Sequence, residues 1–184
     1  MKTDPSAIIG KITAGLYLAD QIDLMHLAIA SLMETVESGD TDLILEQQGK
    51  SSQQKRLYLD KLVAAVRSPE LQAALKDVAQ AGNHDFFLGK SLREFLTDLD
   101  HAVEQVEIIR LSVAIAFNDK DIRQLVNLLS DRLGRSVAFD LSVDPSLIGG
   151  AIIQYGSYLN DYSLKSRLGK FREQWKQAAL EKAP

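Results

Sequence analysis

The stretch "VDPSLIGGAIIQYGSYLNDYSLKSRL", residues 143–168, decides how the second half of the chain folds. It combines an Asp-Pro pair, a Gly-Gly pair, an apolar run and a further glycine, whereas the preceding half is mostly of helical period. Because proline fixes φ and has no N–H to donate, Asp144-Pro145 should end a strand. Gly149 and Gly150 then permit a tight or positive-φ approach to a new strand, residues 151–155. The stretch therefore predicts a compact β-element.

Alternating hydrophobicity continues on both sides of this turn. Residues 107–117 and 136–143 each place apolar side chains at every second position, which predicts two strands with one buried face. Between them lies a helix that Asn118 can cap and Gly134 can end, while Gly156 turns the chain into a weak fourth strand, residues 158–160. The expected inward-facing residues are Ile109, Leu111, Val113, Ile115 and Phe117 in the first strand, and Val137, Phe139, Leu141 and Val143 in the second.

The chain closes with a basic amphipathic helix, for which Asp161 or Ser163 could supply the cap. Its apolar line is Leu164, Leu168, Phe171, Trp175 and Ala178, and from Ser163 onward six basic residues face two acidic ones. The simplest interpretation packs the apolar line on the small sheet and leaves the cations in water. The alternative is that this helix meets a membrane surface, a nucleic acid or an acidic partner.

The first half of the chain shows six segments of helical period separated by short polar joints. Asp4-Pro5 and Ser68-Pro69 each match a cap followed by proline at the first helical position. Short helices of this kind bury their apolar stripes against one another. We therefore predict an α+β protein, with a six-helix bundle over residues 1–105 and a small βαββα domain over residues 106–184. The six segments begin near Ser6, Ile22, Thr41, Leu59, Ser68 and Asn83, and the third ends at Gly49.

Composition narrows the functional classes. With 184 residues, 46% of them hydrophobic, the chain can bury a core, and its net charge of −4 disfavours a general nucleic-acid binder. Because cysteine is absent, disulfides and thiolate metal sites are excluded. No apolar run approaches the roughly 20 residues that span a bilayer. The three histidines, His26, His84 and His101, lack metal-ligand spacing, and the last two are expected to be solvated.

The glycine turn lacks the marks of a catalytic or phosphate-binding loop. It matches neither GxxxxGK[ST] nor GxGxxG, and Ser146 lies outside a GxSxG motif. Asp119 and Asp121 fit a helix start, where the positive end of the helix dipole stabilises negatively charged side chains. We expect no catalytic residue, cofactor or metal. Two alternatives stay open: a small phosphate-binding enzyme that uses the DPSLIGG turn, and an RNA-binding adaptor that uses the last helix.

The order of elements and one motif resemble the δ subunit of the rotary F-type ATP synthase, whose mitochondrial counterpart is the oligomycin-sensitivity-conferring protein. The resemblance covers roughly residues 105–170, and Asn160 and Tyr162 depart from the family pattern. The motif residues are Asp144, Pro145, Ser146, Leu147, Ile148, Gly149 and Gly150, followed by Gly156, Asp161, Ser163 and Leu168.

The resemblance implies a stator component without catalysis of its own. In this family the N-terminal bundle grips N-terminal helices of the α subunits on the catalytic head, and the C-terminal domain holds the b subunits of the peripheral stalk. Rotation is thereby coupled to proton translocation and ATP synthesis. The implied location is the cytoplasmic face of a bacterial plasma membrane, or the matrix or stromal side in an organelle. Membrane contact would be indirect, through the complex, and no nucleic acid is involved.

A helix-binding groove in the bundle would need apolar anchors beside small residues. The helices that begin at Ser6 and Ser68 offer both, because Gly10, Ala14, Gly15, Ala73 and Ala74 lie near apolar positions. The residues expected near the α-subunit site are Ile8, Ile12, Leu71, Leu75 and Val78.

Overall fold

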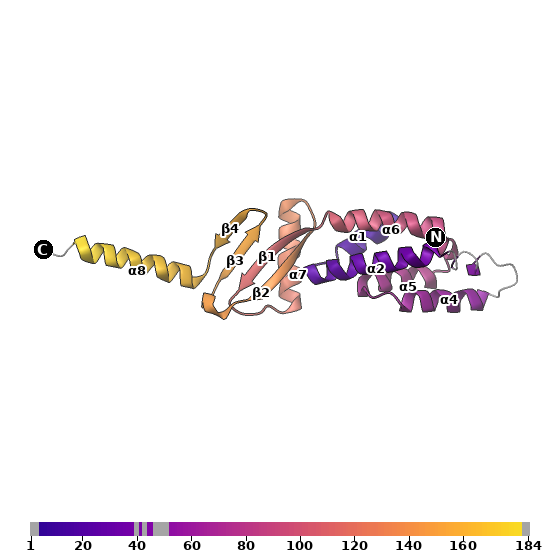
Figure 1. Ribbon diagram of the computed structural model, residues 1–184, viewed down its shortest axis with the longest axis horizontal. Helices are drawn as coiled ribbons and strands as arrows, with labels where there is room; N and C mark the ends of the chain where they lie inside the picture. The colour runs from indigo at the N-terminus through magenta and orange to yellow at the C-terminus, as the bar shows by residue number, and fades with distance from the viewer. Residues whose placement is uncertain (1–3, 39–40, 42–43, 46–51, 182–184) are drawn as a thin grey trace. The chain divides into compact units, whose positions relative to one another are not determined.

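A computed structural model describes residues 4–38, 41, 44–45 and 52–181, with side chains for all of these except 52 and 178–181. The chain forms two compact units (Figure 1). One comprises residues 1–16 and 20–106, and the other comprises residues 17–19 and 107–184. The mixture of helices and a four-stranded sheet confirms the predicted α+β class.

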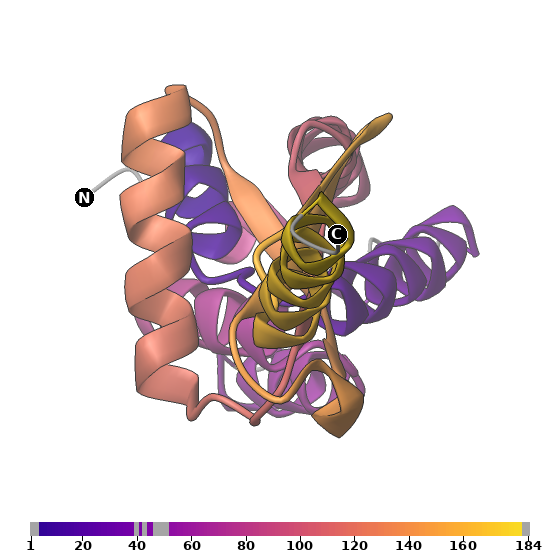
Figure 2. The ribbon, with the colours of Figure 1, turned by 90° about the vertical axis from the view of Figure 1, so that its left-hand side faces the viewer.

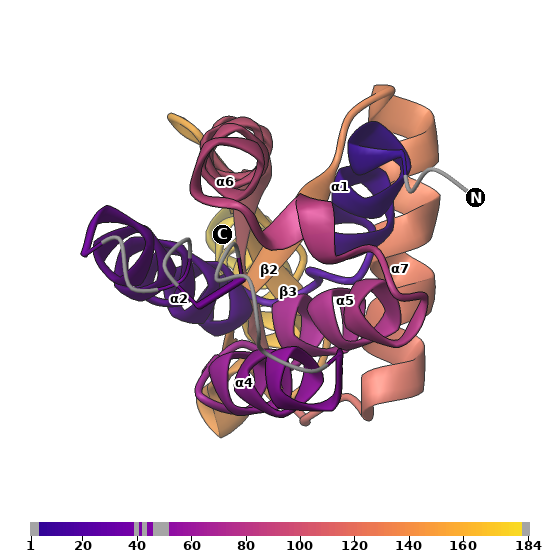
Figure 3. The same ribbon diagram turned by 90° about the vertical axis from the view of Figure 1, so that its right-hand side faces the viewer.

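The first unit is helical. Asp4 and Ser68 both cap helices that have proline in the first turn, as the sequence predicts: Asp4 accepts from the Ser6 amide and Ser68 from the Leu71 amide. Figure 3 looks onto these helices. They are α1 (Pro5–Thr13), α2 (Ala19–Glu37), α4 (Ser52–Ala64), α5 (Pro69–Gln80), the 3₁₀ turn η1 (His84–Phe87) and α6 (Gly89–Glu104).

The core of the first unit is built on the predicted apolar stripes. Three aromatic rings pack together in it: Phe86 lies edge-on to both Phe87 and Phe95, with ring centroids 5.6 and 5.0 Å away. Among the side chains that are buried almost completely are Met25, Ile29, Leu71, Leu75, Phe87, Leu92, Phe95, Leu96, Leu99 and Val103.

Two predicted helices of the first unit have different limits, and a third lies mostly outside the described residues. The apolar stripe of the first helix was expected to continue to Leu16 and Ala19, but α1 ends at Thr13 and the segment Tyr17–Ala19 belongs to the second unit. The helix predicted after Asn83 starts instead with η1, and the extended backbone of Leu88 separates η1 from α6. Of the segment predicted from Thr41 to Gly49, only Thr41, Ile44 and Leu45 lie within the described residues, and these three are helical.

The second unit is a sheet with two helices. Its elements are β1 (Glu107–Val113), α7 (Asp119–Leu133), β2 (Val137–Val143), the 3₁₀ turn η2 (Pro145–Leu147), β3 (Ala151–Tyr155), β4 (Tyr158–Asp161) and α8 (Leu164–Glu181). Strand β1 pairs in parallel with β2, and α7 connects the two. On its other side β1 pairs antiparallel with β3, and β3 pairs antiparallel with β4, so the sheet order is β2-β1-β3-β4.

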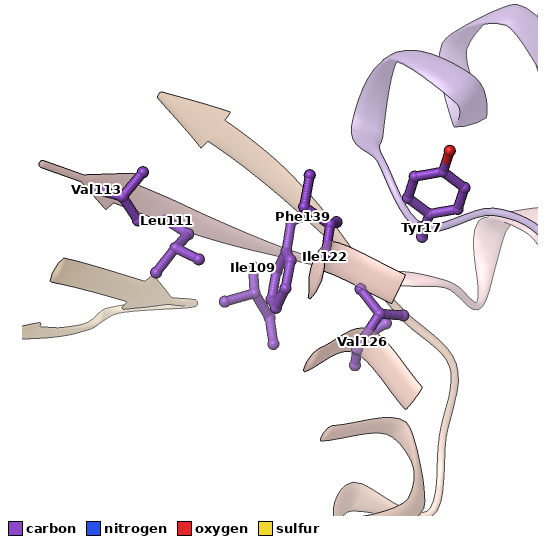
Figure 4. Close-up of a cluster of buried hydrophobic side chains, with 8 residues drawn as sticks. Tyr17, Ile109, Leu111, Val113, Ile122, Val126 and Phe139 are labelled. Carbon is purple, nitrogen blue, oxygen red and sulfur yellow. The ribbon is translucent and has the colours of Figure 1, made fainter. Parts of the chain in front are cut away.

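Helix α7 packs on this sheet, as its apolar face predicts. Asn118 caps it by accepting from the Asp121 amide, and Gly134 ends it in the left-handed region at φ 67°. Ile122 and Val126 on α7 meet the buried side of the strands (Figure 4). The buried cluster consists of Tyr17, Ile109, Leu111, Val113, Ile122, Val126, Val137 and Phe139.

Two strand predictions need correction. The first strand ends at Val113 rather than Phe117, and Ile115 is 76% exposed. Val113 pairs with the last residue of β2 and the first residue of β3, so no partner strand continues beyond it. In β2 the predicted alternation also fails, because Ala138 is buried while Val143 at the strand end is exposed.

A short segment from the beginning of the chain extends the sheet. Leu18 forms a parallel bridge with Phe139 of β2, and the Phe139 amide donates to the Tyr17 carbonyl at 2.9 Å. The Tyr17 ring lies 4.4 Å from the Arg123 guanidinium carbon, and Arg123 donates to the Tyr17 hydroxyl at 3.0 Å. The second unit therefore contains residues that precede it by about ninety positions, which the sequence pattern did not indicate.

Candidate docking site

The DPSLIGG turn forms a closed local structure after β2. Asp144 caps η2, because its Oδ1 accepts from the Ser146 amide at 2.9 Å. Pro145 is the first residue of η2, and Leu147 is buried under the turn. Ile148 adopts a positive φ of 67° and exposes its side chain. The turn thus reverses the chain and places Gly149 and Gly150 directly before β3.

The turn seats the start of α8. The Leu164 amide donates to the Gly149 carbonyl at 2.8 Å, and Lys165 Nζ donates to Ser146 Oγ at 3.2 Å. Both predicted caps are used in succession. Asp161 Oδ1 accepts from the Ser163 amide at 2.8 Å, and the buried Ser163 Oγ accepts from the Ser166 amide at 3.1 Å. The motif residues therefore act together to fix where α8 begins.

Each glycine of the pair allows a close approach. A Cβ on Gly149 would lie 2.7 Å from Leu164 Cδ1. Gly150 has φ +77°, and a Cβ there would collide with the Tyr162 carbonyl oxygen. Gly156 also has a positive φ, but the space around it is open. The two adjacent glycines are needed for packing against the end of β4 and the start of α8.

Two carboxylates of this region are stabilised in their charged form. The hydrogen bonds from Ser146 lower the pKa of Asp144, and those from Ser163 lower the pKa of Asp161. A lowered pKa in the folded state means stability that is present at neutral pH and lost as the pH falls through the folded-state pKa. Both turns should therefore weaken in acid.

This linkage can be measured with Asp144→Asn and Asp161→Asn, which keep an acceptor oxygen but do not titrate. We expect each variant to unfold at lower urea concentration than the parent chain at pH 7. The difference should shrink below the ordinary aspartate pKa of 3.8, where the parent carboxyls also become protonated. Urea titrations across this pH range, followed by circular dichroism, test the expectation. A difference that stays constant with pH would contradict it.

Helix α8 exposes the apolar line that the sequence suggested would be covered. Leu164, Leu168, Phe171 and Trp175 are 41%, 56%, 56% and 67% exposed, respectively. The interpretation that this line packs on the sheet is therefore wrong, because α7 occupies the buried side and α8 contacts η2 at its beginning. Figure 2 shows α8 nearly end-on. The side chain of Ala178 lies outside the described residues.

An apolar cavity of about 370 Å³ lies beside the Gly149-Gly150 pair, against which Leu164 of α8 packs. The last residue of β1, Val113, the loop after it, and the start of β3 form its walls. The residues that line it are Val113, Ala114, Ile115, Phe117, Gly149, Gly150 and Ala151. Ile115 and Phe117, which the sequence placed in a strand, thus border a cavity instead.

The first unit has a smaller groove between α1 and α5, of about 130 Å³. Ile8 and Val78 line it, as do Lys11, Ala74, Asp77 and Ala81. Lys11 and Asp77 form an exposed ion pair across the two helices at 3.4 Å. The other predicted partner residues, Ile12, Leu71 and Leu75, are at most 2% exposed and belong to the interior of the unit.

Three backbone N–H groups of the DPSLIGG turn already donate within the turn, so they are not available to bind an anion. The Ser146, Leu147 and Ile148 N–H groups donate to Asp144 Oδ1, the Asp144 carbonyl and the Pro145 carbonyl, respectively. The Ser146 hydroxyl meets Lys165, but both groups are exposed to solvent, unlike an activated nucleophile and its base. This geometry gives the phosphate-binding alternative no support.

The histidines are dispersed. His26 pairs with Asp100 at 2.8 Å, and His101 with Glu104 at 3.5 Å. His84 was expected to be solvated, but its Nδ1 is buried and has no hydrogen-bond partner among the described residues. Within that part of the chain, no three His, Cys, Asp or Glu residues are placed to hold a metal ion. The same part contains no helix long and apolar enough to cross a membrane.

Comparisons with known proteins identify the family. A family model described as ATP synthase delta (OSCP) subunit matches residues 18–175. ATP synthase subunit delta of Anaeromyxobacter sp. (strain Fw109-5) is 31% identical over 152 residues, which is 82% of this chain and 84% of the relative. That of Azorhizobium caulinodans is 28% identical over 77% of this chain and 75% of its own length.

Among solved structures, a chain of the Toxoplasma gondii mitochondrial ATP synthase hexamer is similar, and the match covers 100% of this chain and 99% of that one. Its TM-score is 0.40 at 14% identity, which is too low to show a shared fold. The family match, by contrast, reaches well beyond the motif region into the helical unit. The chain therefore belongs to the ATP synthase delta (OSCP) subunit family and is a peripheral-stalk subunit of that complex.

Proposed function

We propose that this chain is a non-catalytic adaptor that links the α subunits of the catalytic head to the b subunits of the stalk. The helical unit, with the six-helix bundle expected over residues 1–105, would bind N-terminal helices of the α subunits. The unit formed mainly by residues 106–184 would hold the b subunits. The complex would lie on the cytoplasmic face of a bacterial plasma membrane, or on the equivalent matrix or stromal side. The main support for this proposal is that each unit exposes an apolar surface, the α1–α5 groove in the first unit and the apolar line of α8 in the second.

The α1–α5 groove suits a partner helix because its walls are apolar and its neighbours are small. Ile8 and Val78 supply the apolar walls, and Ala74 and Ala81 leave space between them. Its volume of about 130 Å³ is enough for one or two inserted side chains rather than a small molecule of drug size. Helix-in-groove recognition inserts anchors at i, i+3, i+4 and i+7 in this manner.

The lining of the groove fits a role in binding. The charged groups nearest to it are Lys11 and Asp77, which pair with each other at its rim. Such an exposed pair contributes little affinity but can select the orientation of a bound helix. Apolar burial would supply most of the binding free energy, reduced by the cost of association.

Ala81→Glu should weaken binding of the α-subunit N-terminal helix by about tenfold or more, because it places a charge in the apolar groove. Ala73→Glu is the matched control, because Ala73, which was expected beside the groove, is exposed on α5 and does not line it. Isothermal titration of the full chain with an α-subunit N-terminal peptide measures both affinities. Equal loss in the two variants would contradict the assignment of this groove.

The adaptor role itself is tested by co-purification from cells that contain the complex. The parent chain should retain both α and b subunits, and Ala81→Glu should lose α subunits while keeping b subunits. Membrane vesicles with that variant should hydrolyse ATP without pumping protons efficiently, because the head is no longer held. If the parent chain retains neither subunit, the proposed function is wrong.

A further inference from the structure

The exposed line on α8 has the spacing of a coiled-coil seam. Leu164, Leu168, Phe171 and Trp175 are separated by four, three and four residues. This spacing keeps apolar side chains on one seam of two supercoiled helices. At one end of the seam the rings of Phe171 and Trp175 face each other in a tilted arrangement, with centroids 5.8 Å apart. The seam spans about 16 Å of helix, or three turns.

The first residue of the seam and the apolar cavity of the same unit have Gly149 as a common neighbour. That first residue, Leu164, packs against Gly149, and Gly149 lines the cavity together with Ile115 and Phe117. The hydrogen bond from the Leu164 amide to the Gly149 carbonyl holds the two surfaces together at 2.8 Å. A helix that runs along the seam toward the beginning of α8 would therefore arrive at the cavity.

The flanks of the seam carry one sign of charge. Leu164 and Phe171 occupy one seam position of the heptad, and Leu168 and Trp175 occupy the other. The positions beside the seam hold Lys165, Arg167, Arg172 and the neutral Gln174, all exposed. The acidic residue of this span, Glu173, lies on the outer face, where it pairs with Lys176 at 3.6 Å. Flanking charges of a coiled coil meet those of the partner and set partner choice. A second copy of this chain would oppose cation to cation, whereas a helix with acidic flanks would pair favourably.

We propose that the α8 seam and the adjoining cavity form one docking surface for an amphipathic helix with a 4-3 apolar stripe, acidic flanks and an apolar residue at the end that enters the cavity. This inference rests on the proposed function, in which the partner is the stalk. It adds the charge of the partner helix, its register on α8 and the place where it ends.

Trp175 provides a direct reporter, because it is the one tryptophan of the sequence and is 67% exposed. Two synthetic peptides of two heptads share the same leucine seam and carry either glutamate or lysine at every flanking position. With the full-length chain, the glutamate peptide should shift Trp175 emission to shorter wavelength and bind about tenfold or more tightly than the lysine peptide. Added salt should reduce this difference, because the flanks remain near solvent.

Matched variants locate the contact. Leu168→Glu interrupts the seam, and we expect loss of the fluorescence shift, whereas Gln177→Glu adds the same charge outside the seam and should leave it unchanged. Ile115→Asp places a charge at the cavity edge. It should weaken the peptide that has an apolar end residue, and it should not weaken a peptide in which that residue is alanine. Circular dichroism of each variant confirms that it is folded.

Several results would overturn the inference. One is equal binding of both peptides. Another is a Trp175 emission shift that anionic phosphatidylglycerol vesicles produce and neither peptide produces. A third is micromolar self-association of the chain that Leu168→Glu abolishes. Co-purification separates this inference from the proposed function. If Leu168→Glu fails to bind the glutamate peptide yet still retains b subunits, the docking surface is wrong for the stalk while the adaptor role stands. If the parent chain retains no b subunit, the adaptor role fails.

Discussion

Gly150→Ala should severely destabilise the second unit, with a loss of about 2–5 kcal/mol. Gly150 has φ +77°, where an L-residue costs about 1–2 kcal/mol. The added Cβ would also meet the Tyr162 carbonyl oxygen and the Ser163 Cα, which are backbone atoms that cannot rotate away. Relief would require the end of β4 to move, and the Tyr162 amide to Ala151 carbonyl hydrogen bond of 2.9 Å would be strained. Urea unfolding of the variant measures the loss.

Gly156→Ala is the control for backbone strain alone. Gly156 also has a positive φ, +55°, but a Cβ there would have nothing within 4 Å. Its loss should be about 1–2 kcal/mol. Gly169→Ala, in α8 with open space around it, should instead stabilise the helix by up to about 1 kcal/mol. If Gly150→Ala costs no more than Gly156→Ala, the close approach to Tyr162 is not what requires glycine at position 150.

These glycines show which features of the site the sequence could predict. The Asp-Pro pair and the Gly-Gly pair indicated a tight turn between two strands, and residues 151–155 form the strand predicted after it. The conformation of a turn depends on the residues of the turn itself, so the sequence can predict it. The partner that makes Gly150 necessary is the backbone of Tyr162, twelve residues later, and no local pattern identifies it.

Non-local pairing explains the errors in the fold. The alternation of residues 107–117 suggested a longer strand, but β1 ends at Val113 because its neighbours end there. An amphipathic pattern also specifies an apolar face without saying what covers it. Among the predicted groove residues, Ile8 and Val78 line the groove while Ile12 lies in the interior, although Ile8 and Ile12 share one stripe. On α8 the same ambiguity hid an exposed seam, which its 4-3-4 spacing could have indicated.

Tyr17→Ala should destabilise the second unit, although Tyr17 precedes β1 by ninety residues. Tyr17 is 8% exposed and belongs to the buried cluster with Phe139 and Val126. Truncation of a buried aromatic side chain to alanine costs about 3–5 kcal/mol. The variant also loses the ring beneath the Arg123 guanidinium and the hydroxyl that accepts from it at 3.0 Å. Tyr17→Phe keeps the ring and the packing, so its cost should be about 1 kcal/mol.

Hydrogen exchange resolves where this effect is felt. The Phe139 amide donates to the Tyr17 carbonyl, and Leu18 bridges Phe139 on the outer side of β2. Loss of the Tyr17 side chain should therefore release amides of β2 first, because the segment at residues 17–19 is held to that strand by two local contacts and its buried ring. Amides in α6, which lies in the first unit, should keep their protection in the same variant. Faster exchange in α6 with no change in β2 would show that Tyr17 stabilises the helical unit instead, and the assignment of residues 17–19 to the sheet would be wrong.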